Sequence, residues 1–478
     1  MRKFLILLVT LLMLTGCSFK SSEPETVPTE SSAAVTEPTE TEPVWSPYTG
    51  SGKGYVYYHS QERDKNWEED IIYAADSYLE NFHTLTRFPS RFEYIDDVEY
   101  SDEFYDPQQR QKFIDQINEL IPQIPELSDT EILYQLKKLI ATLKDAHTSI
   151  SIPVENYVPI GFEVFYESGY PVYRVSYLPT KYEYAMFSAL EGINDLSIYQ
   201  VIDRLKPYLS YENDYWLASL LSGDGYPGYL ACTDLLLVAG VIENADEPIR
   251  YRLRNPSGFP ITLKLESCEL DKFQDLETTG WTHYIAYPEI YGNDDTQYYH
   301  YKMIPEADIL YVRFNEFTPM TDYPILNFGN DILREARDAG GVKKLVVDLR
   351  RNPGGSQTLG FPEFITVLQR LDAEQIYVLI DHGTFSCAIL MASQIKVKIP
   401  DAIFVGTPAG QPPNFYGGMY DGDYTMPHSE IICRIPTAYY RTIPDYEYDA
   451  LMPDVPVYPT IEDFADGIDT ILEAAKAH

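Results

Sequence analysis

The sequence predicts an α/β fold in which parallel strands of one sheet are joined by helical crossovers. Three observations lead to this prediction. From about residue 306, short apolar runs alternate with longer segments of helical periodicity, an order that favours parallel strand pairs. Residues 48–152 carry mainly helical patterns, and residues 153–270 carry strand alternation and turns. The parallel-sheet core should therefore follow a helical region and a smaller strand-rich region.

The N-terminus resembles a secretory signal of the lipoprotein type. Arg2 and Lys3 precede an apolar run over residues 4–13, which is too short to cross a bilayer as a helix. Small residues lie before Cys17, and in the lipoprotein pattern that cysteine becomes the first mature residue and carries the lipid. We therefore expect a signal peptide over 1–16 and an extracytoplasmic protein that is anchored to the membrane through Cys17. An ordinary signal with a chance cysteine is the alternative.

Residues 17–47 are expected to form an extended, disordered tether. Ser, Thr, Pro and Glu dominate this segment, and such residues bury too little apolar surface to offset the entropy of ordering. The formal charge of the whole chain is −37, which argues against nucleic-acid partners and against electrostatic binding to anionic lipid. Attachment to a membrane should therefore depend on the lipid.

Residues 48–152 should form a helical N-terminal domain. Apolar residues recur every three or four positions over 71–79 and over 132–143, the spacing of a buried helix face. The second helix should end shortly before His147, and residues 148–152 look like a short strand.

Residues 153–270 should form an accessory domain of PDZ-like type. Alternating apolar residues indicate strands, and the turn sequence at 255–258 joins two of them as a hairpin. The strands are expected at 173–177, 249–253 and 261–265, and a short helix at 198–205.

Residues 271–478 should contain the parallel-sheet core. Strands are expected at 309–313, 344–348, 374–380 and 402–406, and helices at about 323–339, 364–371 and 386–396. In sheets of this kind, functional sites gather where strands end and helices begin. Ser386 lies at such a junction.

Ser386 and His147 are the candidate nucleophile and base. A hydroxyl becomes a nucleophile only when a base lies within hydrogen-bond reach. The first N–H groups of the helix after Ser386, including that of Cys387, are suited to stabilise an oxyanion. The simpler interpretations are a helix N-cap for Ser386 and a helix-dipole partner for His147. His382 and His428 are alternative bases.

Gly354 and Gly355 follow the strand predicted at 344–348. Paired glycines let backbone N–H groups turn towards a ligand, so one of them is a candidate second oxyanion donor, and a plain tight turn is the alternative. We expect Cys387 to be a small packing residue. The remaining cysteines lack zinc-site spacing, so we predict no metal and no other cofactor.

Several blocks, in this order and spacing, resemble the C-terminal processing and tricorn-core-like serine peptidases. The blocks are 348–355, 384–388, 406–410, 413–417 and 452–457. Residues 190–216 resemble the PDZ-like insert of one extracellular branch. The resemblance implies a crotonase/ClpP-like core over 271–478, with Ser386 as the nucleophile. It also implies an oxyanion hole formed by the glycine pair and the amide after the serine.

The two branches of this family use different bases. The processing branch uses a lysine, but Pro412 stands at that position here, which excludes a lysine base unless a neighbour such as Lys396 or Lys398 substitutes. The tricorn-like branch uses a histidine in an Asp-x-His block, which residues 145–148 resemble, so His147 is implied as the base. A further carboxylate should orient it, unless the acidic residues near the C-terminus merely form a surface loop. The candidates are Asp445, Glu447 and Asp449.

These observations predict a lipid-anchored, extracytoplasmic serine peptidase that acts on peptides or proteins through a Ser386–His147 dyad. The main alternative is an inactive binding or scaffolding protein on the same fold, because Pro412 and Cys387 depart from the processing-branch pattern. A pure binder would have no chemical reason to keep His147. Hydrolysis of non-peptide esters or amides by the same dyad is a third interpretation.

Overall fold

The computed structural model describes residues 62–152, 156–224, 227–269, 281–283, 297–418 and 423–478. The predicted signal peptide, Cys17 and the tether lie outside these residues. Within them, no helix is both long and apolar enough to cross a membrane.

Three helices form the N-terminal region and pack their apolar faces together. They are α1 (Glu62–Asn81), α2 (Pro107–Leu120) and α3 (Asp129–Ala141). Ser128 and Glu131 form a capping box that fixes the start of α3. The helices predicted at 71–79 and 132–143 are confirmed, and His147 lies in the turn that follows α3.

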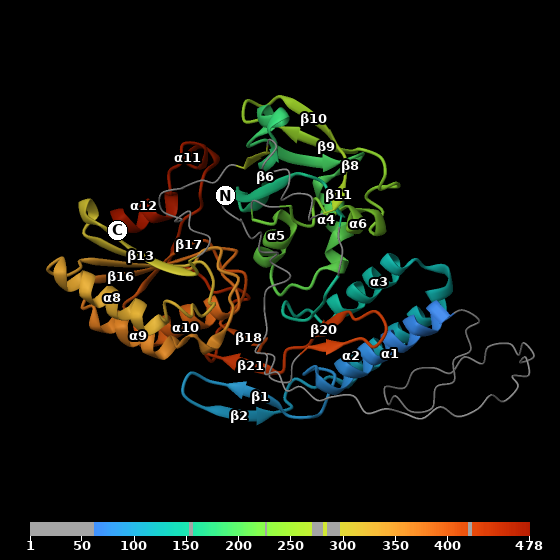
Figure 1. Cartoon of the computed structure of the whole chain (residues 1–478), viewed down its shortest axis with the longest axis horizontal. Coiled ribbons are helices and arrows are strands. Elements are labelled where there is room, and N and C mark those ends of the chain that lie inside the picture. The colour runs from blue at the N-terminus through green and yellow to red at the C-terminus, as the bar shows by residue number, and fades with distance from the viewer. Residues whose placement is uncertain (1–61, 153–155, 225–226, 270–280, 284–296, 419–422) are drawn as a thin grey trace, which may run out of the picture.

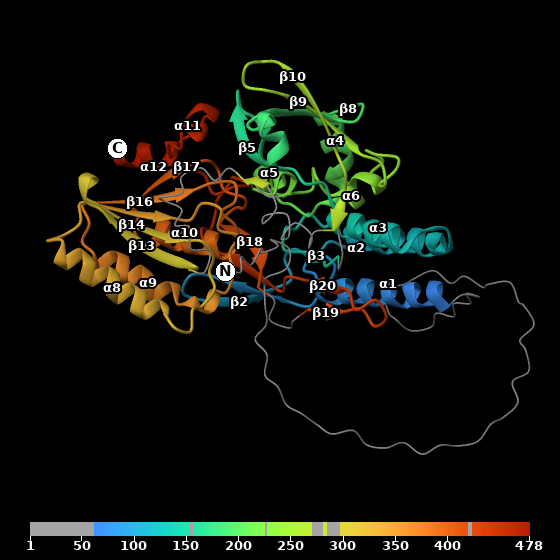
Figure 2. The same ribbon diagram turned by 45° about the horizontal axis from the view of Figure 1, so that its top comes forward.

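A C-terminal segment runs back to this helical region. Strand β20 (Ile432–Arg434) pairs with β3 (Ser149–Ile150), and β21 (Ala438–Arg441) pairs in parallel with β1 (Ser90–Glu93). β21 also pairs with β18 (Asn414–Gly417), and β1 with β2 (Val98–Ser101). Figure 1 shows β20 beside α1 and α2, and Figure 2 shows it from a second side. This return ties the segment after His147 to the chain that follows Ser386.

The middle region is an antiparallel sheet in the order β10-β9-β7-β6-β12, with β5 paired to β6. Its main strands are β5 (Gly161–Glu167), β6 (Tyr170–Pro179), β7 (Ala189–Ile193), β9 (Ile249–Arg254), β10 (Pro260–Leu265) and β12 (Trp281–His283). Its main helices are α4 (Ile198–Leu205), α5 (Asp214–Ser222) and α6 (Thr233–Val238). The predicted hairpin and the helix at 198–205 are confirmed.

The core is a six-stranded sheet in the order β13-β14-β15-β16-β17-β22. Only β13 runs antiparallel to its neighbour; the other pairs are parallel. The strands are β13 (Tyr299–Ile304), β14 (Ile309–Phe314), β15 (Lys344–Asp348), β16 (Gln375–Ile380), β17 (Ile403–Gly406) and β22 (Val455–Pro456). The helices are α8 (Ile325–Asp338), α9 (Phe361–Arg370), α10 (Cys387–Lys398), α11 (Ile461–Ala465) and α12 (Thr470–Ala477). In Figure 1, α8, α9 and α10 cover one face of the sheet, and α12 lies on the other. The predicted parallel sheet with helical crossovers is confirmed.

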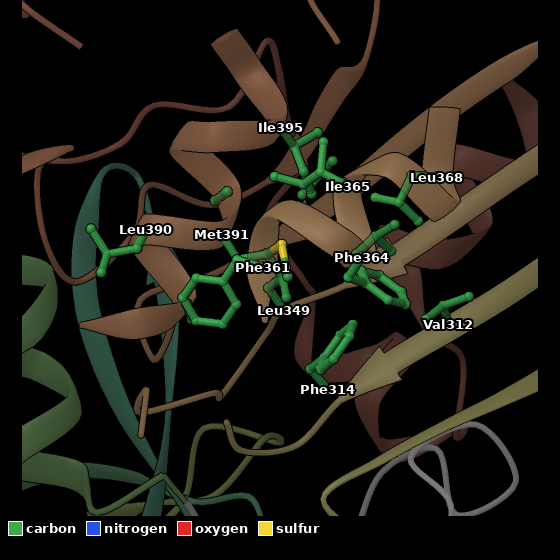
Figure 3. Close-up of a cluster of buried hydrophobic side chains, with 14 of the residues drawn as sticks. Val312, Phe314, Leu349, Phe361, Phe364, Ile365, Leu368, Leu390, Met391 and Ile395 are labelled. Carbon is green, nitrogen blue, oxygen red and sulfur yellow. The ribbon is translucent and has the colours of Figure 1, made fainter. Parts of the chain in front are cut away.

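Helix α10 is held by apolar contacts on all sides. Its residues from Cys387 to Ser393 are buried without interruption, and a helix that is apolar all round belongs inside a core. Figure 3 shows Leu390 and Met391 of this helix in one cluster with Phe361 of α9 and Leu349. Because this helix is fixed on every side, the position of Ser386 at its start is fixed as well.

Candidate active site

Ser386 occupies a strained corner between β16 and α10. Its backbone angles are φ 55° and ψ −120°, close to the first central position of a type II′ turn, where glycine is strongly preferred. A non-glycine residue held there costs about 1–3 kcal/mol, and such strain gathers at functional sites. The hydroxyl makes no capping hydrogen bond to the helix, so the simpler N-cap interpretation does not describe this serine.

The side chain of His147 contacts that of Ser386. His147 Nε2 lies 2.9 Å from Ser386 Oγ, although the two residues are 239 positions apart in the chain. Asp145 holds the turn that carries the histidine, because its Oδ1 accepts the N–H groups of His147 and Thr148, each at 2.9 Å. The structure thus brings together the serine and the histidine that the sequence singled out.

Aromatic rings enclose the imidazole of His147. Phe385 stacks on it with ring centres 4.7 Å apart, and Phe415 does so at 5.5 Å. Trp216 in turn stacks on Phe385, with ring centres 4.0 Å apart. Burial of the imidazole lowers the pKa of His147 to about 3, so the ring is neutral at pH 7 and has a free nitrogen lone pair.

Two polar side chains that the sequence did not indicate surround this pair. Gln411 Oε1 accepts the Ser386 N–H at 3.1 Å, and Gln411 Nε2 lies 3.3 Å from His147 Nδ1. The same nitrogen donates to Glu212, at 2.9 Å to Oε1 and 3.1 Å to Oε2. Glu212 Oε1 also accepts the N–H of Ala146 at 3.3 Å. Burial and the nearby Asp145 raise the pKa of Glu212 to about 8.

The predicted histidine-orienting carboxylates do not lie at His147. The side chains of Asp445, Glu447 and Asp449 are exposed, and the carboxylate that reaches the site is Glu212, from the loop just before α5. These three residues therefore match the surface-loop alternative. Glu212 comes directly before Asn213, which caps α5, but nothing in that local pattern signals contact with a histidine.

The competing bases lie elsewhere. His382 contacts Asp224 at 3.0 Å, and His428 contacts Glu69 at 2.6 Å. Lys396 and Lys398 lie in the last turn of α10, at the opposite end from Ser386, and pair with other carboxylates. Beside Pro412, where the processing-branch lysine would stand, it is Gln411 whose side chain enters the site.

Two backbone amides near Ser386 are candidates to hold an oxyanion. The N–H of Gly354 already donates to Asn352 Oδ1 at 2.9 Å. In the described part of the chain, the amides of Gly355 and Cys387 have no hydrogen-bond acceptor. A side chain at Gly354 would meet Ser386, since its Cβ would lie 2.5 Å from Ser386 Cβ. The φ of 106° at Gly354 also favours glycine.

Cys387 is an unreactive neighbour. Its Sγ donates to the carbonyl oxygen of Gly355 at 2.9 Å, and burial raises its pKa to about 12. A thiol with so high a pKa carries almost no thiolate at pH 7. The contact fits the predicted packing role.

Asp145, His147 and Glu212 also form a group that could ligate a metal ion, with one ligand atom from each within 4.8 Å of the others. However, these groups are already engaged in hydrogen bonds. Both ring nitrogens of His147 have partners, Asp145 Oδ1 accepts three bonds, and Glu212 accepts from Gln411. The geometry therefore favours proton transfer at this site over metal binding.

The most informative comparison is with solved structures. The mature form of CPAF, solved in complex with lactacystin, superposes with a TM-score of 0.57 and 11% identity, covering 87% of this chain and 98% of that one. The chain has the CPAF fold. A second structure of mature CPAF gives a TM-score of 0.51 and 13% identity, with 87% and 96% covered. At such identities the similarity establishes the fold, which agrees with the predicted fold class.

A photosystem II D1 C-terminal processing protease is also similar, at a TM-score of 0.40 and 14% identity, with 87% of this chain and 97% of that one covered. Neither a family model nor a curated protein sequence matches the chain.

Proposed function

We propose that this chain is a serine peptidase in which Ser386 is the nucleophile and His147 is the base. The observation that carries the proposal is the 2.9 Å contact between His147 Nε2 and Ser386 Oγ. The strained backbone at Ser386, the neutral imidazole and the two available amides support it. The fold shared with CPAF, which was solved with bound lactacystin, is consistent with it.

In the proposed reaction, Ser386 Oγ attacks a peptide carbonyl carbon and gives its proton to His147 Nε2. The oxyanion accepts hydrogen bonds from the amides of Gly355 and Cys387, and each such donor contributes roughly 2.7–4 kcal/mol in the transition state. His147 then protonates the leaving amine, and the acyl group remains on Ser386. Water, deprotonated by His147, releases the acid product.

The test is labelling of the full chain, purified in detergent, with a fluorophosphonate probe, followed by intact mass and peptide mapping. We expect one adduct on Ser386, which is absent from Ser386→Ala and strongly reduced in His147→Ala. Lactacystin should compete with the probe if the site binds it as CPAF does. A metal chelator should leave the labelling rate unchanged. A folded protein without an adduct would instead favour the inactive binding protein.

Labelling of Ser386 is expected to fall by much less than about thirtyfold between about pH 8 and about pH 5, and any change should follow the titration of Glu212 and Asp145, whose pKa values burial raises to about 8 and about 7. With a pKa of about 3, the His147 imidazole remains neutral over this range. A histidine with the ordinary pKa of about 6.5 would be almost fully protonated at pH 5, and labelling would slow roughly thirtyfold. The second-order labelling rate measured across this range checks the prediction, with the fold monitored by circular dichroism. A thirtyfold decrease in a folded protein would show that the imidazole is not buried as described.

We also propose that the chain is lipid-anchored through Cys17 and lies outside the cytoplasm. The support is the sequence: a charged start, a short apolar run and small residues before the cysteine. Cells fed a palmitate analogue should label the protein in its membrane fraction. Cys17→Ser should lose the label and leave the membrane, whereas Cys268→Ser should keep both. A Cys17→Ser protein that still carries the label would contradict the proposal.

A further inference from the structure

The side chain of Gln411 has a defined orientation in the candidate active site. Its Oε1 accepts the backbone N–H of Ser386 at 3.1 Å. An N–H group can only donate, so the oxygen end of the amide must face Ser386. The nitrogen end therefore faces Glu212 and His147.

The two hydrogens of Gln411 Nε2 have two destinations. One is the carboxylate of Glu212, whose oxygens lie 2.9 and 3.1 Å away. The oxygens of one carboxylate lie side by side, whereas the two N–H bonds of an amide diverge, so the second hydrogen points elsewhere. The remaining neighbour is His147 Nδ1, at 3.3 Å.

This contact fixes the tautomer of His147. Because Gln411 Nε2 can only donate, Nδ1 must accept and cannot carry a proton. A neutral imidazole then carries its proton on Nε2, which donates to Ser386 Oγ at 2.9 Å. In this tautomer Nε2 has no lone pair to take the serine proton, so the arrangement is unreactive.

We propose that Gln411 is a positioning residue that holds His147 in this unreactive tautomer, and that Glu212 replaces it at Nδ1 when the site becomes active. The inference rests on the proposed peptidase function. The ionised form of Glu212 can only accept a hydrogen bond, so at pH values above its pKa of about 8 Glu212 beside Nδ1 would favour the reactive tautomer, with the proton on Nδ1 and Nε2 free. The change balances: one proton leaves Nε2 for solvent and one from solvent reaches Nδ1.

Glu212 is close enough, and has enough space, for this exchange. One of its carboxylate oxygens lies within 4.8 Å of a ring nitrogen of His147. Glu212 also lines a cavity of about 620 Å³ between α2, α3 and the loop after α4. The Glu212 side chain is therefore not closely packed on the side of this cavity.

The decisive variant is Gln411→Glu. Glutamate retains an oxygen for the Ser386 N–H and places a carboxylate oxygen, rather than an N–H donor, beside Nδ1. We expect fluorophosphonate labelling of Ser386 in the full chain to become at least about tenfold faster. Gln411→Met removes the donor without adding an acceptor and should give a smaller increase. A decrease in both variants, with the fold intact by circular dichroism, would show that Gln411 supports the reactive site and would overturn the inference.

Glu212→Gln provides the matched control. Under the proposal it removes the activating acceptor and lowers the labelling rate, and adding Gln411→Glu to it restores the rate. If Glu212 only supports the fold, the second substitution restores nothing, and the inference fails.

The tautomer of His147 can be determined by NMR, independently of any labelling or hydrolysis. In full chain labelled with ¹⁵N-histidine, the His147 signals are assigned by their loss in His147→Gln. We expect Nδ1 to be unprotonated in the natural protein and protonated in Gln411→Glu. A protonated Nδ1 in the natural protein would overturn the inference and leave the peptidase proposal standing. An unprotonated Nδ1, with no labelling in any variant, would contradict the peptidase proposal alone.

Discussion

Replacing Ser386 by glycine is expected to abolish peptide hydrolysis and, at the same time, to stabilise the protein relative to the alanine variant. Loss of the nucleophilic serine costs on the order of 10⁶ in turnover in a serine protease. The φ of 55° at Ser386 remains strained in Ser386→Ala but not in Ser386→Gly. Relief of about 1–3 kcal/mol of strain should exceed the roughly 0.5–1 kcal/mol entropic cost of glycine. The glycine variant should therefore be more stable than the alanine variant by up to about 2.5 kcal/mol.

Turnover of a quenched-fluorescent peptide library and chemical denaturation measure the two effects. Ser393→Ala is the matched control, because Ser393 is a buried serine on the same helix but has no part in the site; its turnover should be unchanged. Equal stabilities of the glycine and alanine variants would show that the corner stores no strain. Substantial turnover by either Ser386 variant would contradict the proposal that Ser386 is the nucleophile.

Local patterns in the sequence were sufficient to predict most of the core and the hairpin. The strands over 344–348 and 261–265 were predicted to within a residue at each end, because alternation and turn residues act over a few positions. The contact between Ser386 and His147 could not follow from such patterns, since it joins two distant segments. Chemistry made the two residues candidates for a nucleophile and its base, and the resemblance to a family strengthened the case for His147 over the other possible bases.

The residues around the dyad were harder to predict. Glu212 reaches the site from the middle region, and Gln411 contacts it through a side-chain amide with no distinctive motif. The pairing of β21 with β1 and of β20 with β3 also joins segments that are far apart in the sequence. The resemblance implied a group that orients the histidine, and the three acidic candidates near the C-terminus were chosen for that role; their exposed positions show that a carboxylate in the sequence does not specify proximity. Such placement depends on how domains meet, which no local pattern encodes.

Replacing Arg350 by methionine is expected to lower the free energy of unfolding by about 3–5 kcal/mol. Arg350 is 2% exposed and lies between two buried carboxylates. Its guanidinium donates to Asp348 at 2.5 and 3.0 Å and to Asp469 at 2.7 and 2.8 Å. Arg313 also pairs with Asp348, at 2.9 Å, so Asp348 keeps one cation, whereas Asp469 loses both of its hydrogen bonds from Arg350. Without Arg350, a buried carboxylate is left without its cation. Removing one partner of a buried ion pair destabilises a protein far more than replacing the whole pair by apolar residues.

Urea denaturation of Arg350→Met beside Arg250→Met tests this expectation. Arg250 pairs with Asp195 at 3.0 Å on an exposed surface, where a pair contributes about 0–1 kcal/mol. Arg350→Lys should recover little, because one ammonium group cannot reproduce two forked pairs. Arg350 is also two residues before Asn352, whose side chain holds the Gly354 amide. Labelling of Ser386 should therefore slow in Arg350→Met under conditions in which the protein is still folded. Equal stability losses in the two methionine variants would show that the buried network contributes no more than a surface pair.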